Sequence, residues 1–302
     1  MDCSSALVDS CFLENKNPVP EFDQCVTFYD FYQCPKSNKT KEHVYVVVTP
    51  SSPSSSLYEF TTTTFVHSFF PHFDADVVIR KMMKGKNWTT SKYFGKTANE
   101  IKKEWAENGK SASSLGTKMH ASIEDFYNHS ANLYQKTEAE LLPILSNFSP
   151  WKTPEFKQFL VFHFSGPYQW KWIPWRTELR VYDAELQVAG SVDMLYQSPN
   201  YTTENKLLIM LDWKRSKEIK KDNPWETALP PVQDLPSANY YQYSLQLNIY
   251  KYIIEKNTPY RIEYMGLGVF HPNHHSYEFY EVHSMPSYVK KMTEHRMNQL
   301  RK

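Results

Sequence analysis

Cysteine and glycine are both scarce in this 302-residue chain, which has 4 cysteines and 8 glycines. The cysteines, Cys3, Cys11, Cys25 and Cys34, all lie near the N-terminus, and none forms the close CxxC pair typical of zinc sites. We interpret them as free thiols of an intracellular protein. The few glycines and many aromatic residues are typical of a packed globular protein, which excludes a disordered chain.

Long hydrophobic runs are also missing. The apolar stretches at 44–48 and 207–211 are far too short to span a bilayer. The N-terminus has no basic region followed by an apolar run, so we expect neither a secretory signal nor a membrane partner.

A net charge of only +1 excludes a polycation that binds nucleic acid over its whole surface. Two local basic patches remain, at 80–103 and 214–221. The first has eight basic residues against the single acid Glu100, with aromatic residues between them. That pattern suits phosphate contact and base stacking, and the candidate residues are Lys84, Lys86, Trp88, Lys92 and Tyr93. On charge alone, a solvated helix face or loop accounts for either patch as well.

Periodicity divides the chain into a variable, partly flexible N-terminal region at 1–64 and a main domain at 65–302. The N-terminal region has one extended piece, HVYVVVT. Within the main domain, a helix is expected at 113–128, where Ser113 or Ser114 could cap its start, and an aromatic-rich insertion near 150–175. Strands are expected at 178–182, 187–196, 206–214, 262–270 and 277–282, with helices at 239–256 and the C-terminus. This order predicts an α/β fold with a mixed central sheet flanked by helices.

The strand LIMLDWKRS ends in two charged residues on one face. Alternation places Asp212 and Lys214 on one side and Leu211 and Trp213 on the other. Such groups are costly to bury unpaired, so a strand that delivers both favours a polar site at its end. A surface ion pair at a strand terminus is the alternative.

Asp193 lies among apolar neighbours in the preceding strand. A tight connection between the strands would bring Asp193 beside Asp212, and two close carboxylates favour a hard divalent ion such as Mg²⁺ or Mn²⁺. Asp193 could also be an ordinary turn or strand-end aspartate.

Two helices carry polar residues at four-residue spacing. Gly116, His120 and Glu124 share one stripe of the early helix, where a local His and Glu hydrogen bond is the alternative to a metal site. Gln246 and Tyr250 align on the later helix, where the alternative is a solvent-facing stripe.

Taken in order, GTKMHASIE, ELRVYDAELQVAGSVDML, LIMLDWKRS and QLNIY resemble the successive motifs of PD-(D/E)XK nucleases of the RecB-like branch. That branch includes the RecB nuclease domain, CRISPR-associated exonucleases and the mitochondrial genome-maintenance exonuclease. The resemblance covers about 65–282 and implies a restriction-endonuclease-like core in the order αβββαβ.

The resemblance also implies roles for individual residues. His120, Asp193 and Asp212 would bind Mg²⁺ or Mn²⁺ together with the backbone carbonyl of Trp213, and Lys214 would position or activate the attacking water. Supporting or DNA-contacting roles would fall to Glu124, Glu178, Gln246 and Tyr250. The two acids match loosely, and a structural salt bridge is the alternative for each. The iron–sulfur cluster of some relatives is expected to be absent, because no cysteine follows Cys34.

The implied activity is metal-dependent cleavage of DNA, by an exonuclease acting on ends or single strands rather than by a sequence-specific endonuclease. A nonspecific endonuclease, a catalytically silent nucleic-acid-binding module and an RNA-directed enzyme remain alternatives. Replication, recombination, repair and viral genome processing all use such enzymes.

Overall fold

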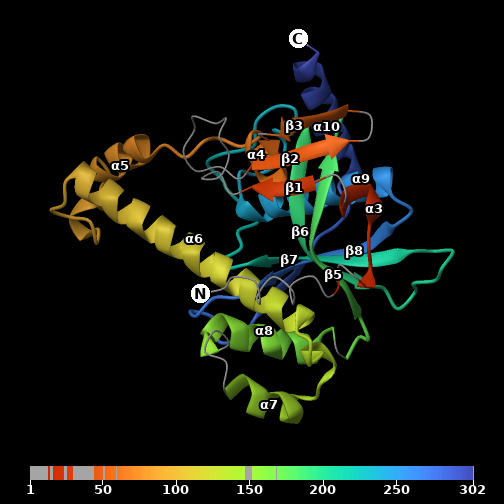
Figure 1. Ribbon diagram of the computed structural model, residues 1–302. Coiled ribbons are helices and arrows are strands. Elements are labelled where there is room, and N and C mark those ends of the chain that lie inside the picture. The colour runs from red at the N-terminus through yellow and green to blue at the C-terminus, as the bar shows by residue number, and fades with distance from the viewer. Residues whose placement is uncertain are drawn as a thin grey trace.

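The computed structural model of the protein describes residues 13, 16–23, 26–29, 44–49, 52–58, 60–146, 152–167 and 169–301. Its centre is a mixed six-stranded sheet (Figure 1). Five of the strands pair in the order β4-β6-β7-β8-β9, and the sixth strand, β5, also pairs with β6. The strands are β4 (Phe60–Thr61), β5 (Ile173–Asp183), β6 (Val188–Gln197), β7 (Leu207–Lys214), β8 (Arg261–Val269) and β9 (Glu278–Glu281). The predicted α/β class and mixed central sheet are confirmed.

Helices cover both faces of this sheet. One face packs against α4 (Thr62–His67), α9 (Asn239–Asn257) and α10 (Pro286–Leu300), and we call their shared interior the α9-side core. The other packs against α6 (Ala98–Asn128) and α8 (Pro154–Ser165), and we call that interior the α6-side core. The short η3 (Leu133–Gln135) and α7 (Glu138–Ser146) follow α6. Because β7 lies between the two cores, its sequence is almost wholly apolar until Asp212.

The N-terminal residues add α3 (Pro20–Asp23) and a separate antiparallel sheet of β1 (Val26–Tyr29), β2 (Val44–Thr49) and β3 (Ser52–Tyr58). The extended piece HVYVVVT corresponds to β2. The boundary expected at 64 falls inside α4, and β4 before it pairs with β6. Val19 and Phe22 are buried in the α9-side core, so part of the N-terminal region belongs to the main fold.

The aromatic-rich segment expected as an insertion forms α8 and the start of β5. Phe156, Phe159 and Phe162 are fully buried in the α6-side core. The rings of Phe159 and Phe162 contact the indole of Trp213 and the ring of Phe270, so α8 is integral to the layer that supports β7.

The early helix starts 15 residues before the expected position, because α6 begins at Ala98. Thr97 caps it, and Glu100 bonds back to the Thr97 backbone, which completes a capping box. Ser113 and Ser114 lie exposed in the middle of the helix, so the cap predicted at these residues is wrong.

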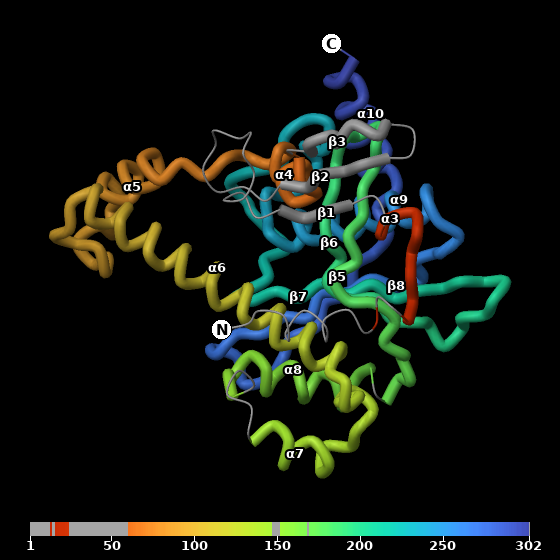
Figure 2. Tube along the Cα trace, viewed as in Figure 1, coloured from red at the N-terminus to blue at the C-terminus, as the bar shows by residue number. Residues whose placement is uncertain are grey.

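The first half of α6 projects from the body, as Figure 2 shows, and carries α5 (Ala75–Met83) and η2 (Trp88–Thr90) at its end. Asp74 caps α5 by accepting bonds from the backbone of Asp76 and Val77. No helix among the described residues is long and apolar enough to cross a membrane.

The strands β6 and β7 diverge at one point. Their antiparallel pairing runs from Gln197 opposite Leu208 to Met194 opposite Leu211, and stops there. Beyond it, β6 continues beside β4 and β5, whereas β7 continues beside β8 to Lys214. This fork holds the candidate site.

Candidate metal centre

Three elements deliver metal-ligating side chains to the fork. His120 comes from α6, Glu178 from β5 and Asp193 from β6, and one potential ligand atom of each lies within 4.8 Å of the others. The Nδ1 atom of His120 is 3.5 Å from Asp193 Oδ2. All three side chains are half-buried, so the cluster is sheltered but reachable from solvent.

Glu178 reaches this cluster because of its backbone. Its φ is +45°, in the left-handed region that is unfavourable for a residue with a Cβ. Thr177 accepts a hydrogen bond from Asn128 on α6, whereas Leu179, two residues on, packs into the α9-side core. Ordinary strand alternation would put both on one face, so the twist at Glu178 breaks the alternation and brings its carboxylate to the α6 side.

The environment of Glu178 opposes its ionisation. Burial is the main cause of a pKa well above the usual value for glutamate, and the negative charges of Asp193, Glu124 and Asp212 raise it further. One hydrogen bond, from Ser191 Oγ at 2.7 Å, acts in the opposite direction. The fold therefore holds several carboxylates close together against their mutual electrostatic repulsion.

Asp193 also belongs to the backbone structure of the fork. Its Oδ2 accepts a hydrogen bond of 2.7 Å from the Trp213 N–H, just beyond the last β6–β7 pair. The indole of Trp213 is buried in the α6-side core. The bond fixes the Asp193 carboxylate beside the end of β7.

Asp212 and Lys214 form a buried ion pair at that end. Lys214 Nζ lies 2.7 Å from Asp212 Oδ2, and Asp212 is 3% exposed. Burial raises the pKa of Asp212 to about 6 despite the opposing charge of Lys214. For Lys214, burial lowers the pKa, but the charges of Asp212 and Asp193 more than offset it, so the net direction is upward. Lys214 therefore carries its charge at neutral pH.

The Lys214 ammonium has a second contact on its other side, over the ring of Tyr243, 4.7 Å from its centroid. Sequence reasoning did not single out Tyr243, although it precedes Gln246 and Tyr250 at helical spacing. Ser191, the partner of Glu178, was also missed, because nothing in a strand sequence distinguishes it from any other serine.

Gln246 and Tyr250 contact each other on α9, on the side of the α9-side core. Gln246 Nε2 donates to the Tyr250 hydroxyl over 3.3 Å, and Tyr250 is buried in the α9-side core. A Cβ at Gly190 would lie 2.7 Å from both the Tyr250 hydroxyl and Thr62 Oγ1. The absence of a side chain at Gly190 thus permits α9 and α4 to pack closely against β6.

The donor set fits a hard divalent cation. Carboxylate oxygens and one imidazole nitrogen are ligands that Mn²⁺ accepts, and Mg²⁺ prefers the oxygens. Apart from the Lys214 ion pair, the buried Asp212 Oδ2 has no hydrogen-bond partner among the described residues. The clustered carboxylates repel one another, and a bound cation would offset that repulsion. The close trio consists of His120, Glu178 and Asp193. Asp212 is not part of the trio, but it lies near enough for the charges of Asp193 and His120 to act on its pKa.

Of the other expected residues, one lies near the cluster and the others lie away from it. Glu124 is near enough to raise the pKa of Glu178. The candidate nucleic-acid residues Lys84, Lys86, Trp88, Lys92 and Tyr93 lie at the projecting end of α6, away from the cluster (Figure 1). We expected this segment to grip a strand near the site, and the structure does not bring the two together.

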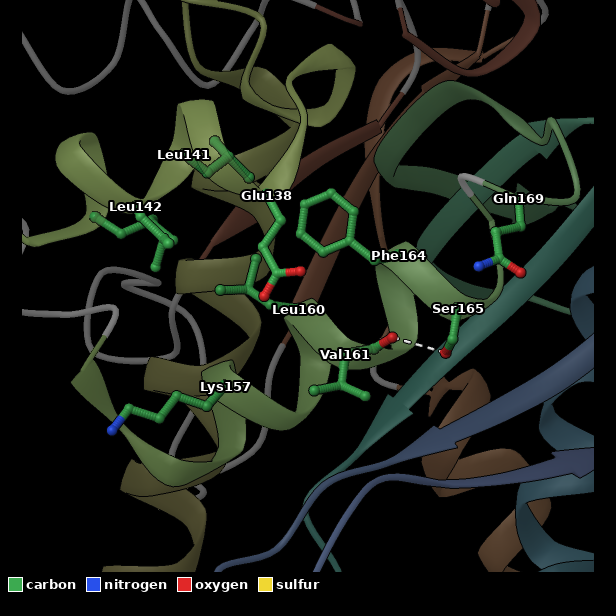
Figure 3. Close-up of a pocket in the computed structure, with 10 residues that line it drawn as sticks. Glu138, Leu141, Leu142, Lys157, Leu160, Val161, Phe164, Ser165 and Gln169 are labelled. Carbon is green, nitrogen blue, oxygen red and sulfur yellow. Dashed lines mark hydrogen bonds between the residues drawn. The ribbon is translucent and has the colours of Figure 1, made fainter.

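A hollow of about 500 Å³ lies between α7 and α8. Leu142, Leu160 and Val161 form much of its apolar lining, and the Ser165 hydroxyl donates to the Val161 carbonyl over 2.7 Å (Figure 3). None of the clustered carboxylates lines it, so it is separate from the candidate metal centre.

No protein-family model matches the sequence, and no curated protein matches it at a significant level. Among solved structures, a crystal structure of a protein designated SSO0001 is similar over 60% of this chain and 70% of that chain. The sequence identity is 13% and the TM-score is 0.24, which is too low to support any functional argument.

Proposed function

We propose that this protein is a metal-dependent nuclease with a restriction-endonuclease-like core, and that its substrate is DNA. The observation that carries the proposal is the meeting of His120, Glu178 and Asp193 within 4.8 Å at the fork, beside the buried Asp212 and Lys214 pair. Carboxylates around a cation, with a lysine nearby, suit phosphodiester hydrolysis. The order of the sequence motifs supports the same assignment.

In this proposal, His120, Glu178, Asp193 and Asp212 would hold Mg²⁺ or Mn²⁺. The bound cation would supply an activated water and offset charge on the phosphoryl group. Two observations support this role: the Trp213 N–H holds the Asp193 carboxylate at the fork, and the left-handed backbone of Glu178 turns its carboxylate toward His120 and Asp193. The Trp213 carbonyl as a further ligand stays an implication of the resemblance.

Lys214 would act on the substrate directly. Because its pKa is raised, it holds its proton at neutral pH and can donate a hydrogen bond but not remove a proton from water. Its part would be to orient the water and to offset negative charge on a phosphoryl oxygen. Asp212 and the Tyr243 ring keep the ammonium in place from two sides.

Preference for ends or single strands over internal cleavage comes from the resemblance. No residue at the fork is assigned to reading a 2′-hydroxyl, so the chemistry accommodates RNA as well as DNA. A circular single-stranded substrate separates exonuclease from endonuclease action.

The test is digestion of end-labelled single- and double-stranded DNA with Mg²⁺ or Mn²⁺, beside the Asp212→Asn variant. We expect metal-dependent products from the wild type and none from the variant. DNA binding without cleavage in either metal would instead favour the catalytically silent binding module. Equal cleavage by both proteins would place the chemistry elsewhere.

A further inference from the structure

The projecting end of α6 is a small packed unit, which we call the arm tip (residues 73–105). Ile79 of α5 and Ile101 of α6 are both fully buried there. The Trp105 indole N–H donates to the Tyr93 hydroxyl over 2.8 Å, and Phe73 lies with its ring centroid 5.8 Å from that of Trp105. The arm tip thus has an interior of its own.

A bare stretch of helix joins the arm tip to the body. Every residue of 106–115 is exposed, and a Cβ added at Gly109 or Gly116 would meet no atom within 4 Å. The next buried residue after Ile101 is Met119, beside His120. At a rise of about 1.5 Å per residue, the helix separates Ile101 from His120 by about 28 Å. The arm tip and the metal centre are therefore two distinct places on one helix.

The arm tip carries a strong excess of positive charge. It has eight basic residues, all within 80–103, against four acids, which are Asp74, Asp76, Glu100 and Glu104. Lys96 pairs with Glu104 and Lys102 with Asp76, which neutralises two of them. The remaining lysines are exposed and make no ion pair within the part of the chain that the structure describes: Lys81, Lys84, Lys86, Lys92 and Lys103.

Aromatic surface accompanies this charge. Phe94 is 56% exposed and meets the half-buried Trp88 edge to face, with ring centroids 5.9 Å apart. Trp88 also lines an open hollow of about 440 Å³ together with Met82 and Lys86. A flat ring beside lysines is the arrangement that stacks an unpaired base while the cations hold the adjoining phosphates. A duplex hides its base faces, so its bases could not stack there.

We propose that the arm tip is a second DNA site, which binds unpaired nucleotides and anchors a single strand about 28 Å along α6 from the carboxylate cluster. The cluster's share in this two-point binding rests on the proposed function; binding at the arm tip does not. A short oligonucleotide occupies one point only, whereas a long one occupies both. The arm tip therefore sets a preference for longer substrates.

Binding is measured without metal, in EDTA, by fluorescence anisotropy of labelled oligothymidines of about 30 and about 5 nucleotides. Trp88→Ala is expected to weaken binding of the long oligomer about 5-fold to 150-fold, which is the range for loss of one stacked base. Trp88→Phe keeps a stacking ring and should retain most of the affinity. Lys84→Ser/Lys86→Ser should weaken binding and flatten its salt dependence.

The matched control is Lys290→Ser/Lys291→Ser, which removes two exposed lysines from α10 and should leave affinity unchanged. The same oligomers made of RNA, and a duplex of equal length, test the class of ligand. Equal affinity of the wild type, Trp88→Ala and Lys84→Ser/Lys86→Ser for the long single strand would overturn the proposal. The proposal would also be overturned if these variants lost more affinity for duplex DNA than for single-stranded DNA.

Cleavage with Mn²⁺ separates this proposal from the proposed function. We expect the Trp88→Ala variant to cleave the short oligomer like the wild type and to lose the preference for the long one. If no protein cleaves but the arm-tip variants bind weakly, the arm-tip site stands and the nuclease assignment fails. If the variants keep the length preference, the arm-tip anchor is wrong while the nuclease assignment stands.

Discussion

The backbone N–H of Trp213 donates to the side chain of Asp193, across the fork where β6 and β7 have stopped pairing. A carboxylate thus takes the place of the carbonyl that would continue the ladder. Asp193 holds the strand ends together and presents its charge to the candidate metal centre at the same time.

This double role predicts a difference between two substitutions at Asp193. Asn keeps an oxygen that can accept the Trp213 bond, so Asp193→Asn should fold normally and lose metal-dependent cleavage. Leu leaves that N–H unpaired, so Asp193→Leu should also lose about 1–3 kcal/mol of stability. Urea unfolding measures both variants. Equal stability of the two would mean that the bond does not support the fork.

Removal of Lys214 should be more harmful to folding than removal of the Asp212 charge. Lys214→Ala leaves the buried Asp212 carboxylate without its partner, which costs about 3–5 kcal/mol when a buried pair is broken. Asp212→Asn removes the charge itself and should cost less. The double variant Asp212→Asn/Lys214→Ala should recover much of the loss, and additive effects in this cycle would contradict the coupling.

Mn²⁺ should raise the thermal stability of the wild type, because a ligand that binds only the folded state stabilises it by about 2.7 kcal/mol at a hundred times its Kd. Glu178→Gln should remove most of this shift. Without metal, the same variant should be at least as stable as the wild type, since the crowded carboxylates oppose its ionisation. The exposed Glu226→Gln is the matched control. An unchanged Mn²⁺ shift in Glu178→Gln would exclude it as a ligand.

His163 makes stability depend on pH. Its Nε2 lies 3.3 Å from the Tyr134 carbonyl and its Nδ1 3.2 Å from the Tyr127 hydroxyl, and burial lowers its pKa to about 4. Protons bind the unfolded chain first, so stability should fall as the pH drops from about 6.5 to about 4, by about 3 kcal/mol in total. His163→Gln should flatten this part of the curve, whereas His283→Gln at an exposed position should not. Identical pH profiles for all three proteins would contradict the assignment.

Five of the six strands of the main sheet could be predicted because their apolar patterns are strong, whereas the two-residue β4 is too short to show a pattern. The alternation that places Asp212 and Lys214 together survives folding, since β7 is regular to its end. The start of α6 could not be placed from hydrophobic periodicity. Residues 106–115 of the helix are all exposed, so no apolar stripe connects its packed start to Met119, and the capping box of Thr97 and Glu100 marks where it begins.

The position of Glu178 was beyond sequence reasoning for another reason. Strand alternation assumes an extended backbone at every residue, and Glu178 departs from it. The contact between Lys214 and Tyr243 likewise depends on how α9 lies against β7, which no local pattern encodes. Sequence could name most members of the cluster, but not the backbone irregularity that assembles it.

The bare part of α6 also gives the arm tip a rotational phase. Each residue added to a helix turns everything beyond it by about 100°, and 3.6 residues complete a turn. One residue inserted in 106–115 would therefore point Trp88 and its lysines in another direction while disturbing no packed side chain. Seven residues would restore the direction and move the arm tip outward by about 10 Å. The direction and the reach of the arm tip thus depend on the number of residues in this stretch of helix, and little on which side chains it carries.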